Sequence, residues 1–245
     1  SVFFDIMKFK SIWVLGSTSE IAISICIELA NKGCNKFHLI SRNNSDNEFL
    51  IRSLKKYRNV EITLEEIDLL EKYNEKVISI KNYDLYLITA GYLGDSNLGY
   101  FQEEEFTKII NINFLSLIPF IKKIISPERL DRSGALWVFS SVAVDRGRPS
   151  NFIYGAAKSG LTVFCEGLAL KNINSKFKVR VLKAGFIDTR MSRGKTISFL
   201  TVKPKVIAKY LLKNANRSGV EYLPGWWRFI MIIVGLLPDK LVSKL

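Results

Sequence analysis

Apolar runs short enough for β-strands alternate with helical patterns along this chain. The predicted strands cover residues 11–15, 36–40, 60–67, 84–88, 134–139 and 178–182. The predicted helices cover residues 20–32, 47–57, 71–81, 103–125, 151–174 and, near the end, 226–237. Strands that alternate with helices in this way pair into a parallel sheet with helices on both faces. We therefore predict an α/β fold, a single Rossmann-type doubly wound sheet followed by an apolar C-terminal helix.

Length and composition indicate one folded domain. The chain has 245 residues, of which 48% are hydrophobic, and this is enough for a sizeable core. Neither an internal repeat nor a low-complexity linker divides the sequence. We expect residues 7–245 to form the domain, with residues 226–245 as its apolar C-terminal helix. Because Met7 is a candidate for the natural start, residues 1–6 are interpreted as a leader or an added segment.

The net charge of +13 favours anionic partners. These include a phosphorylated cofactor or substrate, an acidic membrane surface, or nucleic acid. The basic residues are spread along the chain without a long run, so a generally basic proteome explains them at least as well as a specific patch. The sequence contains no nucleic-acid-binding motif, and we expect no nucleic-acid partner.

Cysteine and histidine usage narrows the classes of chemistry. Cys26, Cys34 and Cys165 are far apart and odd in number, which favours reduced structural thiols and a cytoplasmic protein. The single histidine, His38, lies in an apolar run and is interpreted as a strand residue. A histidine-based metal site or a Ser-His-Asp triad is therefore not expected, and we predict no metal.

The first strand leads through a tight polar turn into a helix, the context in which a phosphate-binding loop occurs. Gly16 permits the sharp turn, while hydroxyl groups and the helix N-terminus offer hydrogen bonds to phosphate. One glycine alone is a weak signal. The expected cofactor contacts from this segment are Gly16, Ser17, Ser19, Glu20 and Ile21.

The ends of the next strands complete the predicted cofactor site. The second strand ends at Ser41 and Arg42, where a carboxylate would bind the ribose 2′-hydroxyl of NAD. A cation there suits the 2′-phosphate of NADP instead, although Arg42 is also interpretable as a solvated loop residue. Asp68 is a candidate to contact adenine, and small Ala90 and Gly91 would let a nicotinamide ribose lie close to the backbone.

Three residues around the fifth predicted strand suggest proton transfer. Ser141 follows the strand, and Tyr154 and Lys158 lie four apart on the next helix, so they share one face. A nearby ammonium is expected to lower the pKa of the Tyr154 phenol. Tyr154 would then protonate a carbonyl oxygen that Ser141 holds by a hydrogen bond. Alternatively, the pair consists of ordinary helix residues, since this spacing arises by chance.

These motifs together resemble the classical short-chain dehydrogenases/reductases over nearly the whole chain. The resemblance rests on Gly16, Thr89-Ala90-Gly91, Asn113, Ser141, Tyr154, Lys158, and Gly185 with Thr189. It implies an NADPH-dependent reductase domain with an Asn113-Ser141-Tyr154-Lys158 catalytic tetrad, in which Asn113 helps to hold a relay water. It also implies that Ile187 and Thr189 lie in a loop that caps the nicotinamide. Two glycines of the family's first loop are replaced here by Glu20 and Ala22, and Ala184 replaces a usual proline.

A narrower resemblance, to decaprenylphosphoryl-2-keto-ribose reductases, rests on residues 16–22, 146–149, 185–191 and the tail. It implies a keto-sugar substrate carried on a polyprenyl phosphate for cell-envelope polysaccharide synthesis. Reduction of a soluble sugar phosphate, a steroid-like ketone or an acyl thioester is the alternative within enzymes. A non-catalytic NADP-binding regulator is the alternative outside them, although such a module needs no proton donor.

The tail provides a separate indication of a lipid-linked substrate. Trp226 to Leu237 is nearly all apolar but shorter than the ~20 residues that span a bilayer. Paired tryptophans and the flanking Lys240 and Lys244 suit a helix at the membrane surface. A core or subunit-interface helix is the alternative. We expect a cytoplasmic homo-oligomer, in peripheral contact with the inner membrane if the tail binds lipid.

Overall fold

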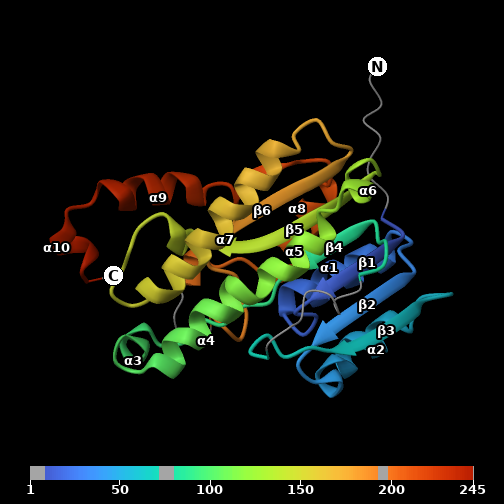
Figure 1. The fold of residues 1–245 in the computed structure, drawn as a ribbon, viewed down its shortest axis with the longest axis horizontal. Coiled ribbons are helices and arrows are strands. Elements are labelled where there is room, and N and C mark those ends of the chain that lie inside the picture. The colour runs from blue at the N-terminus through green and yellow to red at the C-terminus, as the bar shows by residue number, and fades with distance from the viewer. Residues whose placement is uncertain (1–8, 72–79, 193–197, 245) are drawn as a thin grey trace.

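The computed structural model describes residues 9–71, 80–192 and 198–244. Its sheet is parallel throughout, with the strand order β3-β2-β1-β4-β5-β6-β7 (Figure 1). The strands are β1 (Ser11–Leu15), β2 (Lys36–Ser41), β3 (Glu61–Glu66), β4 (Leu85–Ile88), β5 (Gly134–Ser141), β6 (Phe177–Ala184) and β7 (Gly219–Leu223). The order reverses direction between β1 and β4, which is the mark of a doubly wound sheet. The predicted fold class is confirmed.

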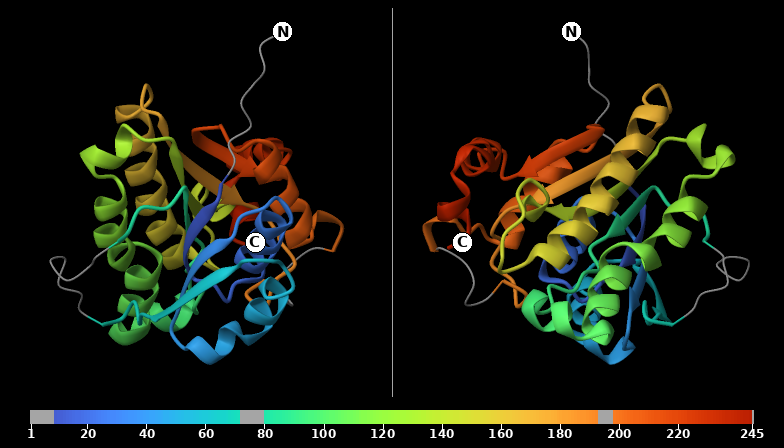
Figure 2. Two further views of the ribbon diagram at one scale, coloured as in Figure 1. Left: turned by 90° about the vertical axis from the view of Figure 1, so that its right-hand side faces the viewer. Right: turned by 60° about the vertical axis from the view of Figure 1, so that its left-hand side comes forward.

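Helices cover both faces of this sheet (Figure 2). The α-helices of the described residues are α1 (Glu20–Asn31), α2 (Glu48–Leu54), α3 (Ser96–Phe101), α4 (Glu103–Asn113), α5 (Ile118–Ile124), α6 (Pro127–Leu130), α7 (Phe152–Lys171), α8 (Pro204–Lys213), α9 (Trp227–Leu236) and α10 (Asp239–Val242). Figure 2 shows α4, α5 and α7 on one face, with α1 and α8 on the other. This arrangement brings the carboxyl ends of all strands to one edge.

Two hydrophobic cores lie on the two faces of the sheet. Residues such as Val14 and Leu39 point to the face covered by α1 and α8, while Leu15 and Ile40 point to the face covered by α5 and α7. Neighbouring strand residues alternate between the cores because successive side chains of a strand point in opposite directions. Both faces are therefore apolar, as expected for a parallel sheet covered on both sides.

One predicted helix differs from the structure, one strand was not predicted, and one predicted helix cannot be compared. The single helix expected over residues 103–125 ends at Asn113 and resumes as α5 at Ile118, with Pro119 in its first turn. The sequence reading also missed β7, whose central Glu221 pairs with the buried Arg180 of β6. A five-residue strand with a charge at its centre lacks the apolar run that indicates a strand. Most of the helix expected over residues 71–81 lies outside the described residues.

The C-terminal helix α9 is attached beside the carboxyl end of β6. Trp227 and Met231 are buried, and they pack with Val142, just after β5, and Phe186, just after β6. The opposite side of α9 is exposed and apolar: Phe229 is 68% exposed and Leu236 is 80% exposed. Within the described residues, no helix combines the length and apolar character needed to cross a membrane.

Candidate active site

A cavity of about 840 Å³ opens at the carboxyl ends of the strands. It extends from Arg42 and Asp68, beyond β2 and β3, to Tyr154 and Lys158 of α7. Between these ends it is lined by the turn after β1, the segment after β4, the end of β5 and the loop after β6. A crevice of this kind, where the strand order reverses, is where doubly wound proteins bind their ligands.

The turn after β1 approaches the segment after β4 so closely that only glycine fits. Gly16 has φ +91°, and a Cβ there would lie 2.5 Å from the Ala90 backbone nitrogen. Ser19 then caps α1 by accepting a hydrogen bond from the Ala22 N–H at 3.2 Å. The N-terminus of α1, with Glu20 and Ile21, thus lines the cavity as expected.

The prediction for Ser17 is wrong as far as its side chain is concerned. Its hydroxyl donates to the carboxamide oxygen of Asn47 at 2.7 Å, and the residue is fully buried away from the cavity. Its backbone N–H donates to the Ile40 carbonyl, so neither group is free to bind phosphate. This serine instead fastens the turn to β2 and to the segment that follows it.

The far end of the cavity carries the residues expected for the adenosine half of a dinucleotide. Ser41 and Arg42 line it, together with Asp68. The Ser41 hydroxyl donates to the Asn43 carbonyl and accepts from the Asn47 amide. That network fixes the backbone after β2 and leaves Arg42, which is exposed, as the cation at this position.

Asn113 is fully buried at the end of α4, behind the residues that line the cavity. Its amide nitrogen donates to the carbonyls of Ile109 and Tyr92, and its oxygen accepts from the Tyr92 N–H at 3.1 Å. The side chain therefore clamps the segment after β4 to the helix at the point where the helix stops. A Cβ at Gly91 would lie 3.1 Å from Asn113 Oδ1 and 3.4 Å from Lys158 Nζ.

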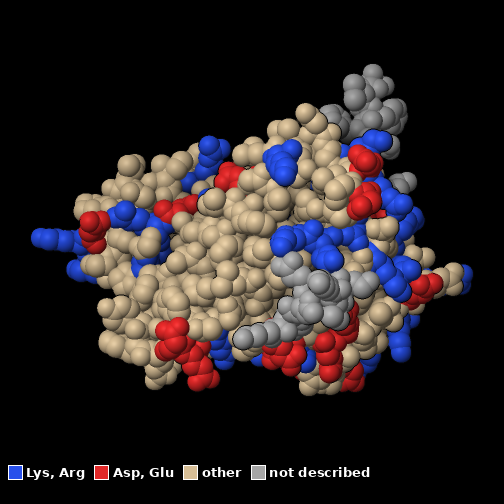
Figure 3. Space-filling model, viewed as in Figure 1, with Lys and Arg blue, Asp and Glu red and all other residues tan. Residues whose placement is uncertain are grey.

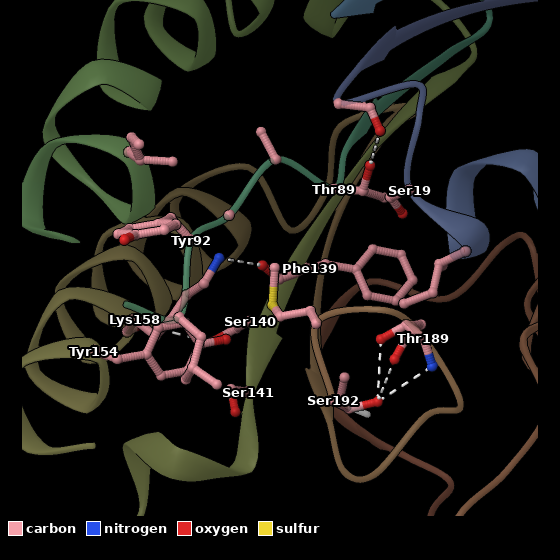
Figure 4. Close-up of a pocket in the computed structure, with 18 of the residues that line it drawn as sticks. Ser19, Thr89, Tyr92, Phe139, Ser140, Ser141, Tyr154, Lys158, Thr189 and Ser192 are labelled. Carbon is pink, nitrogen blue, oxygen red and sulfur yellow. Dashed lines mark hydrogen bonds between the residues drawn. The ribbon is translucent and has the colours of Figure 1, made fainter. Parts of the chain in front are cut away.

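Lys158 projects from α7 into the protein interior (Figure 4). Its ammonium donates to the Phe139 carbonyl at 3.1 Å, and the side chain is 3% exposed. The adjacent Ser140 and Thr162 hydroxyls hydrogen-bond at 2.6 Å, which ties the same helix to β5. Burial lowers the pKa of Lys158 to about 8, because desolvation penalises the charged form.

Tyr154 lies beside Ser141 and Lys158 on the wall of the cavity, as Figure 4 shows. Burial raises the pKa of its phenol to about 12, and a hydrogen bond with Ser141 only partly opposes this. The expected lowering by Lys158 is therefore wrong for this structure. The Lys158 ammonium is 6.0 Å from the ring centroid, and desolvation outweighs any attraction at that range.

The loop after β6 closes the remaining side of the cavity. Ile187 and Thr189 line it, and the Thr189 N–H donates to the Ser192 hydroxyl at 3.1 Å. Arg190 reaches back to the first turn, where its Nε donates to Glu20 Oε1 at 2.9 Å. The Glu20 carboxylate, which stands where the resembled family has glycine, is thus neutralised by a residue 170 positions away.

Sequence reasoning missed several polar residues in the catalytic half of the cavity. These are Tyr92, Lys108, Arg148 and Asn151. Lys108 Nζ lies 4.6 Å from the centroid of the Tyr92 ring. Arg148 belongs to a segment that carried the narrower resemblance, but no spacing rule connects this loop residue to Lys108, which lies on α4.

Comparisons with known proteins agree with this geometry. The short chain dehydrogenase family matches residues 10–197. Since that is most of the chain, the protein belongs to this family. An uncharacterised oxidoreductase of Mycobacterium tuberculosis is 29% identical over 153 residues. That match covers 62% of this chain and only 61% of the relative.

Two further proteins are similar over a larger share of the chain. A 3-oxoacyl-[acyl-carrier-protein] reductase of Chlamydia trachomatis is 28% identical over 192 residues, 75% of this chain and 76% of the relative. Among solved structures, an actinorhodin polyketide ketoreductase with NADPH has a TM-score of 0.72 at 17% identity. The alignment covers 93% of this chain and 98% of the ketoreductase, which shows a shared fold.

Proposed function

We propose that this protein catalyses the NADPH-dependent reduction of a keto group on a sugar. The sugar we favour is a 2-keto pentose attached to a polyprenyl phosphate, reduced during cell-envelope polysaccharide synthesis. The observation that carries the reductase proposal is the meeting of Ser141, Tyr154 and Lys158 at one end of the cavity, where Asn113 holds the backbone of the lining residue Tyr92.

The cavity suits the cofactor in both shape and charge. Gly16 and Gly91 line the cavity without side chains, so a flat ring and its ribose could approach the backbone there, beside Lys158. Arg42, at the other end, suits a 2′-phosphate. The bound cofactor would supply the hydride, and the proposal is supported by the NADPH present in the actinorhodin ketoreductase.

Each candidate catalytic residue has a distinct role in the proposal. Ser141 would donate a hydrogen bond to the substrate carbonyl and so orient it. Tyr154 would give its proton to the same oxygen as negative charge develops there. An alkoxide is a stronger base than a phenolate, so donation remains favourable despite the raised pKa of Tyr154. Lys158 would bind the cofactor ribose and stabilise the phenolate that results, while Asn113 would help to hold a relay water.

The test of the reductase proposal is Tyr154→Phe. This substitution removes the proton donor and little else, so NADPH should still bind while turnover of keto sugars falls by at least about a hundredfold. Cofactor fluorescence measures binding, and absorbance at the reduced nicotinamide band measures turnover. Near-normal turnover in Tyr154→Phe would overturn the assignment. NADPH binding by the wild type without turnover of any ketone would favour the non-catalytic regulator.

A second candidate function is reduction of a 3-oxoacyl thioester. It is favoured by the similarity to the Chlamydia reductase over 75% of this chain. Parallel assays with acetoacetyl-coenzyme A and with keto pentoses, free and prenyl-phosphate-linked, separate the two candidates. A kcat/KM for the thioester that exceeds those for all keto sugars would assign the acyl substrate.

The lipid-linked substrate is supported by the position of α9. Its buried side packs on Val142 and Phe186, which also line the cavity, so the exposed apolar side lies near the active-site mouth. A polyprenyl chain leaves the bilayer only at a cost of about 0.8 kcal/mol per methylene, so the enzyme would have to come to the membrane surface.

We also propose a cytoplasmic homo-oligomer that binds the inner membrane peripherally. Figure 3 shows a broad area without Lys, Arg, Asp or Glu over the middle of the face that carries α4 and α7. Val163 and Leu170 of α7 are 67% and 63% exposed. Light scattering on the purified protein measures the assembly, and a monomeric mass would contradict it.

A further inference from the structure

The catalytic half of the cavity is distinctly cationic. Lys108 and Arg148 line it in addition to Lys158. Among the described residues that line the cavity, the only carboxylates are Glu20 and Asp68, and both stand in the cofactor half. Glu105 lies near Lys108 but outside the lining; its carboxylate accepts hydrogen bonds from the Tyr92 hydroxyl and the Asp95 N–H. A neutral ketone would not need this concentration of positive charge.

Among the described residues, Arg148 has no carboxylate partner. Its Nε is buried and has no hydrogen-bond partner among the described residues. Burial also lowers the pKa of its guanidinium from the ordinary value, because the charge is partly desolvated. Arg148 as a whole is half-buried, but its Nε is a buried polar group of the kind that proteins ordinarily hydrogen-bond. A ligand anion would therefore supply the hydrogen-bond partner that Arg148 Nε lacks among the described residues.

Asn151, three residues further on, adds an acceptor to the same wall. Its side-chain oxygen is likewise buried without a partner among the described residues, and the residue lines the cavity. An unsatisfied acceptor suits a ligand hydroxyl, as an unsatisfied guanidinium suits an anion. One short segment after β5 thus offers groups complementary to a molecule with both a hydroxyl and an anionic group.

We propose that Arg148 and Lys108 form an anion subsite that binds a phosphate on the keto substrate, with Asn151 accepting a hydrogen bond from a neighbouring hydroxyl. This subsite rests on the proposed reductase function, which requires the keto group to lie beside Tyr154. It adds to that function the class of the substrate, a polyhydroxylated phosphate ester. The phosphate is either a monoester on a soluble sugar or the diester that joins a sugar to a prenyl chain.

The test measures binding and turnover with matched probes. Isothermal titration of NADP-loaded protein compares ribulose 5-phosphate with ribulose, and kcat/KM is measured for both. Arg148→Gln should reduce the preference for the phosphorylated probe about tenfold to a hundredfold, and Lys108→Gln several-fold, while the values for ribulose change little. Retained NADPH fluorescence shows that each variant is folded.

Arg146→Gln is the matched control. It removes the same charge from the same segment, but Arg146 pairs with Asp239 of α10 and does not line the cavity. An unchanged phosphate preference in Arg148→Gln, or an equal loss in Arg146→Gln, overturns the subsite. So does a wild type that binds both probes equally.

The binding measurement also separates this proposal from the reductase proposal. A wild type that binds ribulose 5-phosphate through Arg148 but reduces no ketone would retain the subsite and refute the reductase. A farnesylphosphoryl keto pentose distinguishes the two phosphate sources. If it outcompetes ribulose 5-phosphate, and Arg148→Gln removes that advantage, the subsite takes the diester; the reverse order assigns the soluble monoester.

Discussion

Lys158 is a cation held in the protein interior with the Phe139 carbonyl as its hydrogen-bond partner. Desolvation lowers its pKa from 10.5 to about 8, so the folded state binds this proton less tightly than the unfolded chain does. Between those two pH values the unfolded state carries more protons, and stability from this group rises with pH. Below pH 8, the full cost of burying the charge is present.

Lys158→Met tests this pH-dependent contribution to the free energy of unfolding, because methionine is of similar length and does not titrate. The unfolding free energy of the wild type minus that of the variant should increase by about 2–3 kcal/mol between pH 8 and pH 10, at about 1.4 kcal/mol per unit of pKa shift. Denaturant unfolding at fixed pH values measures it. A flat difference across this range would show that Lys158 keeps its ordinary pKa in the fold.

The Arg42 side chain alone is proposed to decide the choice between NADPH and NADH. Arg42→Ala should weaken NADPH binding relative to NADH by about 1.5–3 kcal/mol, the range for a hydrogen bond to a charged group. Dissociation constants from cofactor fluorescence measure the preference. Arg52→Ala is the control, because Arg52 pairs with Glu48 on α2 away from the cavity. A wild type that prefers NADH would contradict our interpretation of this strand end.

At the scale of elements, α9 has two apolar sides with different roles. One holds Trp227 and Met231 against the walls of the active site, so deletion of the whole tail would disturb the cavity as well as any membrane contact. The other presents Phe229, Ile232, Ile233 and Leu236 to the exterior at helical spacing. Only the second side is available for docking, and the exposed Arg228, in the first turn of α9, and Lys240, beyond its end, suit an anionic surface.

The double substitution Phe229→Ser, Ile233→Ser therefore tests membrane docking more cleanly than truncation. It should weaken binding to phosphatidylglycerol vesicles at least about tenfold, since each large apolar side chain contributes about 1.5–3 kcal/mol when fully buried. Vesicle co-sedimentation measures binding. Phe49→Ser, which alters a 60% exposed phenylalanine on α2, should have no effect. If the wild type ignores vesicles and the double variant loses subunits in light scattering, α9 is an assembly helix.

At the scale of the whole molecule, long-range ties hold the cavity together around one sheet edge. Glu20 of α1 pairs with Arg190 after β6, Asn113 of α4 holds the segment after β4, and Ser17 is bonded to Asn47. Each tie joins segments that are distant in sequence. The loops at the carboxyl ends of the strands are consequently held in place by bonds within the protein. The proposed substrate and membrane contacts lie at this same end of the molecule.

The sequence alone determined the fold and most of the candidate site. Strand and helix periodicity are local properties, and alternation of the two leaves few topologies other than a doubly wound parallel sheet. Ser141, Tyr154 and Lys158 were found for the same reason, since a strand end and an i, i+4 spacing are visible within twenty residues of chain.

Only the tertiary structure decided what depends on contacts between distant segments. The sign of the pKa shift at Tyr154 follows from burial, which no spacing reveals. The inward turn of Ser17, the partner of Glu20 and the shared cavity of Lys108 and Arg148 follow from how loops of separate strands meet. Desolvation and charge pairing depend on which groups are close in space, so only the structure reveals them. Periodicity depends on spacing along the chain, so the sequence alone reveals it.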